Sequence, residues 1–394
     1  MYRLRGVVNT KKMNRRRHIQ ISLALTVCAL LITLAGCSTL AKKEETGVVI
    51  ARHAQVRSST AVVAADLVEV NRGDAVDILD TADVQDPSVG ENKERWYRVR
   101  AHDESNTEGW IEARNVMSED VLERSRKLSD EDKSTQTQAS GQLRASTNLR
   151  LMPDRSGNDN IILKLDSGAK FDIVGWKRVP KPKASETTES DDAPKAGSAQ
   201  QNSRKGKSDA PKEPEEQNEL WYKVRLNPSV SPAPAGWLYG KQVELTVPSD
   251  IIFYRTGREF VAWQRLDGGV AGIVPANAPK DKDEGKETSP GSWVILEKSS
   301  VGDTQKANQP DFDRIYVLGY NQETQEHYTA YRSPDIKGFL PLRVEGNGDN
   351  KLFNVRVQDA DGQMRDAQYK VSKDEKGLLK IDAPSEPLKS KKKK

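Results

Sequence analysis

Few side chains in this chain of 394 residues have the spacing that enzyme chemistry requires. The two cysteines, Cys28 and Cys37, both lie near the amino terminus, within or just after an apolar run. His53, His102 and His327 lie far apart, and none occurs in an H-x-H or H-E-x-x-H pattern. Because a zinc centre takes three or four convergent ligands, these histidines predict no metal site. We expect them at the surface, with His327 at an exposed strand position.

Other catalytic patterns are also missing from the sequence. A cysteine peptidase needs a Cys–His pair, and no cysteine follows Cys37. The chain has no Gly-x-Ser-x-Gly motif and no P-loop, and the glycine-rich stretch 267–272 indicates a turn. A glycosidase site needs only two carboxylates across a cleft, and the 58 acidic residues leave that alternative open. We therefore predict a protein with no catalytic residue, no cofactor and no metal.

The residues before Cys37 have the pattern of an export signal. Arg15, Arg16 and Arg17 precede an apolar run over 21–34, and small residues then lead to the cysteine. A run this short is typical of a signal peptide, since a spanning helix needs ~20 apolar residues. An uncleaved membrane anchor is the alternative.

The ending Leu34-Ala35-Gly36-Cys37 resembles the lipobox of bacterial lipoproteins. The resemblance implies cleavage after Gly36 and acylation of Cys37, by diacylglycerol and by a fatty acid such as palmitate, so that the partner is the lipid bilayer. Ser38 stands where enteric lipoproteins retained in the inner membrane carry aspartate. The resemblance therefore favours the periplasmic face of the outer membrane over the inner membrane, in an organism that has an outer membrane.

Cleavage would change the charge of the chain. Residues 1–36 hold seven of the basic residues and no acidic one, so the formal net charge falls from +4 to −3. The basic character of the precursor thus reports its export signal, and we predict no nucleic-acid partner.

The remaining chain contains one series of landmarks twice. The first series is Val56-Arg57, Gly73, Trp96-Tyr97-Arg98-Val99 and Gly109-Trp110-Ile111; the second is Leu149-Arg150, Gly168, Trp221-Tyr222-Lys223-Val224 and Gly236-Trp237-Leu238. The arginine precedes the glycine by 16 and 18 residues, and the two tryptophans are 14 and 16 apart. Matching order, type and spacing indicate an internal repeat.

Each block alternates apolar and polar residues between turn residues, which predicts short, half-exposed strands. Curling into a small barrel would remove the exposed edges of such a sheet. The order of landmarks resembles the bacterial SH3-like domain over 47–117 and 142–247. The resemblance implies two small barrels that bind cell-wall or peptide ligands or act as spacers.

The other segments complete an all-β prediction with disordered linkers. Between the repeats, 118–141 contains a predicted helix over 119–132 followed by a polar linker. The second repeat carries an insert, 177–218, that is rich in proline and charge, and we expect it to be disordered. An antiparallel β domain is predicted over 250–383, and the lysine-rich tail 384–394 is predicted to be disordered.

Turn residues divide the predicted carboxy-terminal domain into strands. We place strands around Phe253–Tyr254, 260–263, 293–296, 314–320, 327–332, 338–344, 352–357, 366–371 and 377–381. The turn Asp359-Ala360-Asp361-Gly362 matches part of a calcium loop, but Lys370 stands where an EF-hand has glutamate. We predict a hairpin turn, because Asp-Gly is a preferred turn pair.

Tryptophans and neighbouring cations are the remaining candidates for ligand binding. Strand alternation puts Tyr97 and Val99 on the core face and leaves Trp96 and Arg98 on the other, near Trp110. An exposed tryptophan beside a cation can stack on a sugar or hold a peptide. The candidates are Trp96, Arg98, Trp110, Trp221, Lys223 and Trp237. The alternative is that these tryptophans only cover small barrels.

These features together predict a non-enzymatic lipoprotein of the cell envelope. Acylated Cys37 would hold it on the membrane, and the SH3-like modules would bind or scaffold peptidoglycan or an envelope protein. The alternative is a cell-wall-active hydrolase with a carboxylate pair in 250–383.

Overall fold

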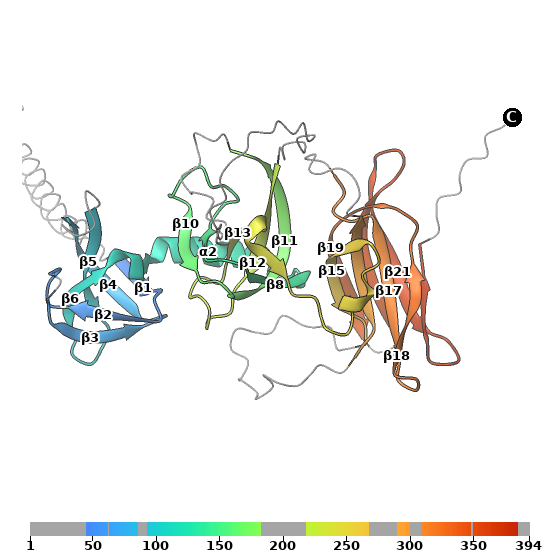
Figure 1. The fold of residues 1–394 in the computed structure, drawn as a ribbon, viewed down its shortest axis with the longest axis horizontal. Coiled ribbons are helices and arrows are strands. Elements are labelled where there is room, and N and C mark those ends of the chain that lie inside the picture. The colour runs from blue at the N-terminus through green and yellow to red at the C-terminus, as the bar shows by residue number, and fades with distance from the viewer. Residues whose placement is uncertain are drawn as a thin grey trace, which may run out of the picture. The chain divides into compact units, whose positions relative to one another are not determined.

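A computed structural model describes residues 45–61, 63–85, 93–182, 218–267, 290–299, 309–347 and 350–384 (Figure 1). The predicted signal peptide, Gly36, Cys37, most of the predicted insert and the lysine-rich tail lie outside the described residues. Antiparallel strands dominate the described part of the chain, where α2 (Glu119–Glu131) is the single α-helix, so the all-β prediction is confirmed. No helix in that part has the length and apolarity to span a membrane.

The first repeat, here called module 1 (45–118), is one curled antiparallel sheet. Its strands are β1 (Glu45–Val49), β2 (His53–Arg57), β3 (Asp66–Asn71), β4 (Ala75–Gln85), β5 (Lys93–Ala101), β6 (Glu108–Glu112) and β7 (Val116–Ser118). They are hydrogen-bonded in the order β3-β2-β6-β5-β4-β1-β7, and the short turn η1 (Ala113–Asn115) precedes β7. The sheet encloses a core in which Val56, Val99 and Ile111 are fully buried.

The second repeat, module 2 (139–245), has the same topology. Its strands are β8 (Ala139–Leu143), β9 (Thr147–Arg150), β10 (Ile161–Leu165), β11 (Lys170–Pro180), β12 (Asn218–Arg225), β13 (Ala235–Tyr239) and β14 (Val243–Leu245), with the turn η2 (Gly240–Gln242). Their order, β10-β9-β13-β12-β11-β8-β14, repeats that of module 1 strand for strand. The landmark glycines occupy the same turn in both modules, Gly73 just before β4 and Gly168 just before β11. Both have positive φ, a conformation that favours glycine.

Helix α2 lies between the modules in the sequence and confirms the predicted helix. Leu122 is buried, and Val121 and Leu128 pack against the same core, as their helical spacing predicts. Acidic Glu119 and Asp120 occupy the first turn, where the helix dipole favours negative charge.

The carboxy-terminal residues form two four-stranded antiparallel sheets. The first contains β15 (Arg258–Arg265), β16 (Trp293–Ser299), β17 (Arg314–Asn321) and β18 (Glu326–Arg332); the second contains β19 (Lys337–Asn347), β20 (Asn350–Gln358), β21 (Met364–Lys373) and β22 (Leu379–Asp382). Apolar side chains of both sheets, among them Val294, Val317 and Phe353, share one buried core. The predicted hairpin at 359–362 joins β20 to β21, with Gly362 at positive φ donating to the carbonyl of Asp359.

Three local predictions differ from the structure. Residues 252–254 form the 3-10 turn η3 (Ile252–Tyr254) instead of a strand. Lys177–Pro180 extends β11 and pairs with β12, so the predicted disordered insert begins too early. The predicted polar linker after α2 contains Gln138, which is fully buried. Propensity describes a residue's own preference, whereas these segments are ordered by remote partners.

The remote partner of Gln138 is the edge strand β19. The Gln138 amide donates to the carbonyl oxygen of Leu342 at 2.9 Å and accepts from the Leu342 N–H at 2.6 Å. Gln136 makes the same pair of bonds with Val344, at 2.7 Å and 2.8 Å. Two side-chain amides thus take the place of a neighbouring strand, satisfying an edge that would otherwise invite pairing with another chain.

Candidate functional site

Cross-strand pairing builds a similar row of three side chains in each module. In module 1, Trp110 of β6 lies opposite Arg98 of β5 and Arg57 of β2. Residues directly opposite each other in an antiparallel sheet share a face, so one tryptophan stands between two cations. We call Arg57, Trp110 and Arg98 the Trp–cation row of module 1.

Module 2 has the corresponding row in the same order. Trp237 of β13 lies opposite Lys223 of β12 and Arg150 of β9. Arg150 is fully buried, and its guanidinium donates to the Asn160 side-chain oxygen at 2.6 Å. The repeat therefore preserves a three-residue arrangement as well as a fold.

The predicted face assignment is right, but the predicted exposure of two tryptophans is wrong. Tyr97 and Val99 pack with the core of module 1, as alternation predicts. Trp96, on the other face, is only 4 % exposed, and its counterpart Trp221 is 1 % exposed. The outer face of each sheet is therefore covered around this tryptophan. Alternation along one strand assigns a residue to a face but does not show whether that face is covered.

A buried ion pair covers the outer face of module 2. Arg155, in the loop after β9, makes a bidentate contact with Glu219, with its Nη2 2.6 Å from Oε1, and both side chains are almost fully buried. The guanidinium also lies 4.6 Å from the ring centroid of Tyr239, and that ring packs against Trp221. The loop, the ion pair and the two rings thus form a closed layer that leaves Trp221 without an accessible face.

The end of helix α2 forms ion pairs and hydrogen bonds with the cations at the other end of this face. The Lys223 ammonium lies 2.8 Å from the Glu131 carboxylate and 2.5 Å from that of Asp132. Arg225 donates to the carbonyl oxygens of Asp132 and Thr135. The acidic carboxyl end of the helix and the residues just after it therefore take up the basic side chains of β12, and Lys223 is only 8 % exposed.

The corresponding cations of module 1 are more exposed, Arg98 by about half of its side chain and Arg100 by about a third. Arg98 and Arg100 both donate to Glu108, each at 3.0 Å, and the side chain of Arg98 is 48 % exposed. The Arg100 guanidinium holds the pKa of the Glu108 carboxyl below its usual value, with a smaller contribution from Arg98. Trp110 beside them is partly buried.

Sequence reasoning overlooked several members of this face. Arg57 and Arg150 are landmarks of the repeat but are not among the predicted binding residues, and their recurrence at equivalent positions in both repeats is the signal for them. Arg100 and Arg225 follow the predicted cations by two positions, so alternation places them on the same face. The role of Glu108 had no signal, because module 2 has Ala235 at that position.

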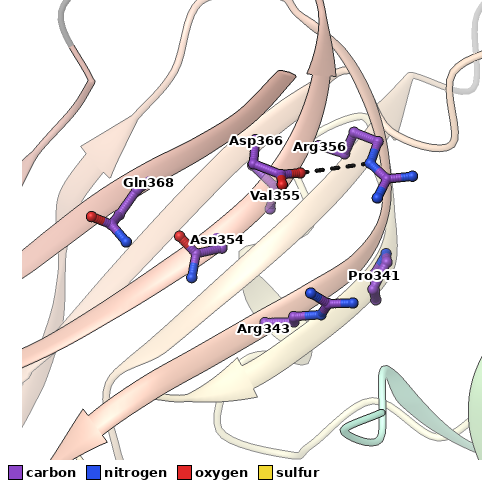
Figure 2. Close-up of a pocket in the computed structure, with 7 residues that line it drawn as sticks. All are labelled: Pro341, Arg343, Asn354, Val355, Arg356, Asp366 and Gln368. Atoms are coloured by element: carbon purple, nitrogen blue, oxygen red, sulfur yellow. Dashed lines mark ion pairs between the residues drawn. The ribbon is translucent and has the colours of Figure 1, made fainter. Parts of the chain in front are cut away.

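A second candidate lies on the outward face of the sheet β19–β22 (Figure 2). A groove of about 370 Å³ is lined by Pro341, Arg343, Asn354, Val355, Arg356, Asp366 and Gln368. It forms where the register of β19 against β20 shifts between Phe339 and Arg343. Its carboxylate, Asp366, forms an ion pair with Arg356 at 3.6 Å. Guanidinium and amide groups of this kind suit a polar or acidic ligand.

His327 is not the surface residue that the sequence predicts. Its side chain is 7 % exposed, and its Nε2 lies 2.9 Å from the carbonyl oxygen of Gly291 and 3.9 Å from the Asp250 carboxylate. The rings of Tyr254 and Tyr320 both pack against the imidazole, with centroids 5.4 Å and 5.0 Å away. Strand β18 is an edge of its sheet, but the segment 250–254 covers it there.

His53 and His102 are exposed on module 1, in agreement with the prediction. Within the residues that the structure describes, no three His, Cys, Asp or Glu side chains group in a way that could hold a metal ion.

Comparisons with known proteins add little to this picture. No family model matches the sequence, and no curated protein does. Among solved structures, the chain is similar to "NlpC2 from Trichomonas vaginalis" at 7% identity, over 87% of this chain and 96% of that one. The TM-score is 0.15, so this likeness carries no argument about fold or activity. The interpretation of the site therefore rests on the geometry of the chain itself.

Proposed function

We propose that this chain is a non-enzymatic envelope lipoprotein whose SH3-like modules bind or scaffold peptidoglycan or an envelope protein. One observation carries the proposal: the Trp–cation row is built twice, and among the described residues helix α2 places acids on the cation of module 2 only. Lys223 is taken by α2, whereas Arg98 of module 1 keeps about half of its side chain in solvent. Module 2 is in this proposal the structural copy, and module 1 is the one that meets a ligand.

The chemistry of the module 1 row suits such ligands. A partly buried indole offers an apolar face for a sugar ring or a peptide side chain. Guanidinium groups bind carboxylates through paired, charge-assisted hydrogen bonds, and peptidoglycan carries carboxylates on its stem peptides. Of the six predicted binding residues, Arg98 and Trp110 keep this role in the proposal. The other four, Trp96, Trp221, Lys223 and Trp237, are assigned a structural role, each within its own module.

The anchor is part of the same proposal. Acylated Cys37, with Gly36 as the last residue removed, would hold the modules at the membrane, and Ser38 favours the outer membrane. Replacing Cys37 with serine is expected to release the protein from the membrane fraction and to abolish palmitate labelling. Retention of the serine variant in washed membranes would contradict the lipid anchor.

A hydrolase is the weaker candidate, because the groove lacks a pair of carboxylates. A glycosidase-type site needs two carboxyl groups facing each other across a cleft. The groove in Figure 2 is lined by one carboxylate, Asp366, which is already paired with Arg356. A turnover assay of the mature protein on purified cell wall tests this alternative directly, because release of soluble fragments would establish it.

Co-sedimentation with insoluble peptidoglycan tests the binding function. The mature protein is compared with the double variant Arg98→Ala/Trp110→Ala and with His53→Ala, which changes an exposed residue of module 1 away from the row. We expect the double variant to lose about tenfold in retention and the control to bind normally, since a charge-assisted contact contributes about 1.5–3 kcal/mol. Equal retention of all three proteins would remove the row from the wall-binding function.

A further inference from the structure

The two modules can be compared residue by residue along the face that carries the row. The shared strand order and register give the following equivalent positions: Arg98 and Lys223, Arg100 and Arg225, Glu108 and Ala235, Trp110 and Trp237. Three of these four positions keep their chemical type. The fourth exchanges a carboxylate for a methyl group, so the difference between the modules is concentrated at Glu108.

Module 2 shows what this face binds when it is occupied. Helix α2 contacts β13, and its Ser125 hydroxyl donates to the Ala235 carbonyl oxygen at 2.6 Å. Ala235 returns a bond from its N–H to the same hydroxyl at 3.2 Å. The carboxyl end of α2 then places Glu131 and Asp132 on the cation of β12. Helix α2 is thus fixed to the backbone of β13 by one hydroxyl, and its two terminal acids reach the cation on the face that carries the row.

Module 1 holds a carboxylate of its own in the equivalent place. Glu108 stands where module 2 has Ala235, and it bridges Arg98 and Arg100. Arg100 is also 3.8 Å from Asp77. The contacts of Glu108 lie at the surface, where ion pairs contribute ~0–1 kcal/mol, so Glu108 can be exchanged for another carboxylate at small cost, whereas the Asp77 carboxylate beside Arg100 is mostly buried. Glu108 therefore acts as an exchangeable internal substitute for the acids that α2 supplies in module 2.

We propose that module 1 binds the acidic carboxyl end of a helix from a partner protein, through Arg98, Arg100 and Trp110. The inference rests on the proposed binding function and names its partner: a helical segment that ends in two adjacent acids. The partner's carboxylates displace Glu108 from the two guanidinium groups, and the body of its helix packs along β6 at Glu108, the position equivalent to Ala235. Charge complementarity and the occupied copy in module 2 both point to this partner.

A peptide with the sequence of residues 119–135 is the natural probe. It carries the acid-ended helix, and in the mature protein the module 2 face is already filled by the chain's own copy of that segment. Binding of the labelled peptide to the mature protein is measured by fluorescence anisotropy at low salt, since exposed charge contacts weaken as salt screens them. The charge-reversed peptide with Glu131→Lys and Asp132→Lys serves as the ligand control.

Variants of module 1 distinguish binding at the row from non-specific attraction of the peptide to any exposed arginine. We expect Arg98→Ala and Arg100→Ala each to weaken binding about tenfold, which corresponds to about 1.4 kcal/mol. Glu108→Ala, which makes module 1 resemble module 2, should strengthen binding several-fold because it removes the internal competitor. Arg95→Ala is the matched control, because Arg95 is an exposed arginine on the same strand that pairs with Asp83.

Several outcomes would overturn the inference. Unchanged affinity in Arg98→Ala and Arg100→Ala, or equal binding of the charge-reversed peptide, would remove the row as the site. Loss of binding in Lys223→Ala but not in Arg98→Ala would show that the probe displaces α2 from module 2. Concentration-dependent dimers that Arg98→Ala dissociates would make a second copy the occupant. Failure of the peptide to bind, with wall retention still dependent on Trp110, would reject this partner and leave the proposed function standing.

Discussion

Replacing Arg155 with methionine tests how the outer face of module 2 is kept closed. The guanidinium of Arg155 approaches both carboxylate oxygens of Glu219, with Nε at 3.1 Å and 3.2 Å and Nη2 at 2.6 Å. Methionine is an unbranched side chain of comparable length, but it removes the charge and the guanidinium that lies over the Tyr239 ring. The Glu219 carboxylate, whose side chain is 4 % exposed, is then left without its cation.

The expected magnitude follows from that burial. Removing one partner of a buried ion pair costs about 3–5 kcal/mol, because the remaining charge stays desolvated and uncompensated. Loss of the cation–π contact with Tyr239 adds about 1 kcal/mol. The double variant Arg155→Met/Glu219→Leu removes both charges together and should lie within about 1–2 kcal/mol of the native protein.

Hydrogen exchange followed by mass spectrometry is the assay, because it reports the local opening of one module within a chain of several. Peptides covering 147–165 and 218–225 should exchange about three to four orders of magnitude faster in Arg155→Met, since the summed cost is about 4–6 kcal/mol and each ~1.4 kcal/mol is a factor of ten. Peptides of module 1 serve as the internal reference. The single variant Glu219→Leu completes the comparison. If Arg155→Met changes exchange less than fivefold, or if the effects of Arg155→Met and Glu219→Leu simply add in the double variant, the buried pair does not hold this loop.

Three further predictions concern other parts of the chain. Gln138→Ala should cost about 1–3 kcal/mol, because the Leu342 N–H loses its acceptor, and faster exchange of β19 than of β21 would show it. Gly338→Ala should lower the unfolding temperature or prevent folding, because the new methyl group meets the buried Phe312 ring; an unchanged melting curve would refute this contact. Burial raises the pKa of Tyr222 to about 12, and the folded state therefore holds the phenol proton where the unfolded chain, with a pKa of about 10, releases it. This stabilisation is complete below pH 10 and is lost as pH rises to 12, so urea midpoints of the native protein should fall over that interval and those of Tyr222→Phe should fall less.

Much of the fold can be predicted from local patterns. Alternation of period two and turn residues locate the strands β15 to β22 within a few residues, and helical spacing locates α2. The repeat predicts that the two modules share a fold, and their strand orders agree. Phe253 and Tyr254 show the limit, because two adjacent aromatic residues suit a strand and a 3-10 turn equally well.

The candidate site is predictable only in part. Directly opposed residues can be inferred once the register is known, and the sequence already shows Arg98 and Trp110 on neighbouring strands. Whether these side chains are accessible to a ligand cannot be inferred, since Lys223 has the same local pattern as Arg98 but is buried and paired with Glu131. The contact joins residues that are 92 positions apart, which no local pattern encodes.

The sequence by itself determined the strand periodicity, the duplicated landmarks and the predicted lipid site at Cys37, because each depends on residues close together in the chain. Only the tertiary structure decided which of two equivalent faces is closed. The closing groups, Arg155 and the end of α2, reach β12 from distant positions, and their desolvated charges make that closure specific. The same fold leaves Arg98 and Trp110 of module 1 within reach of a partner, because no acid from α2 is placed on them among the described residues.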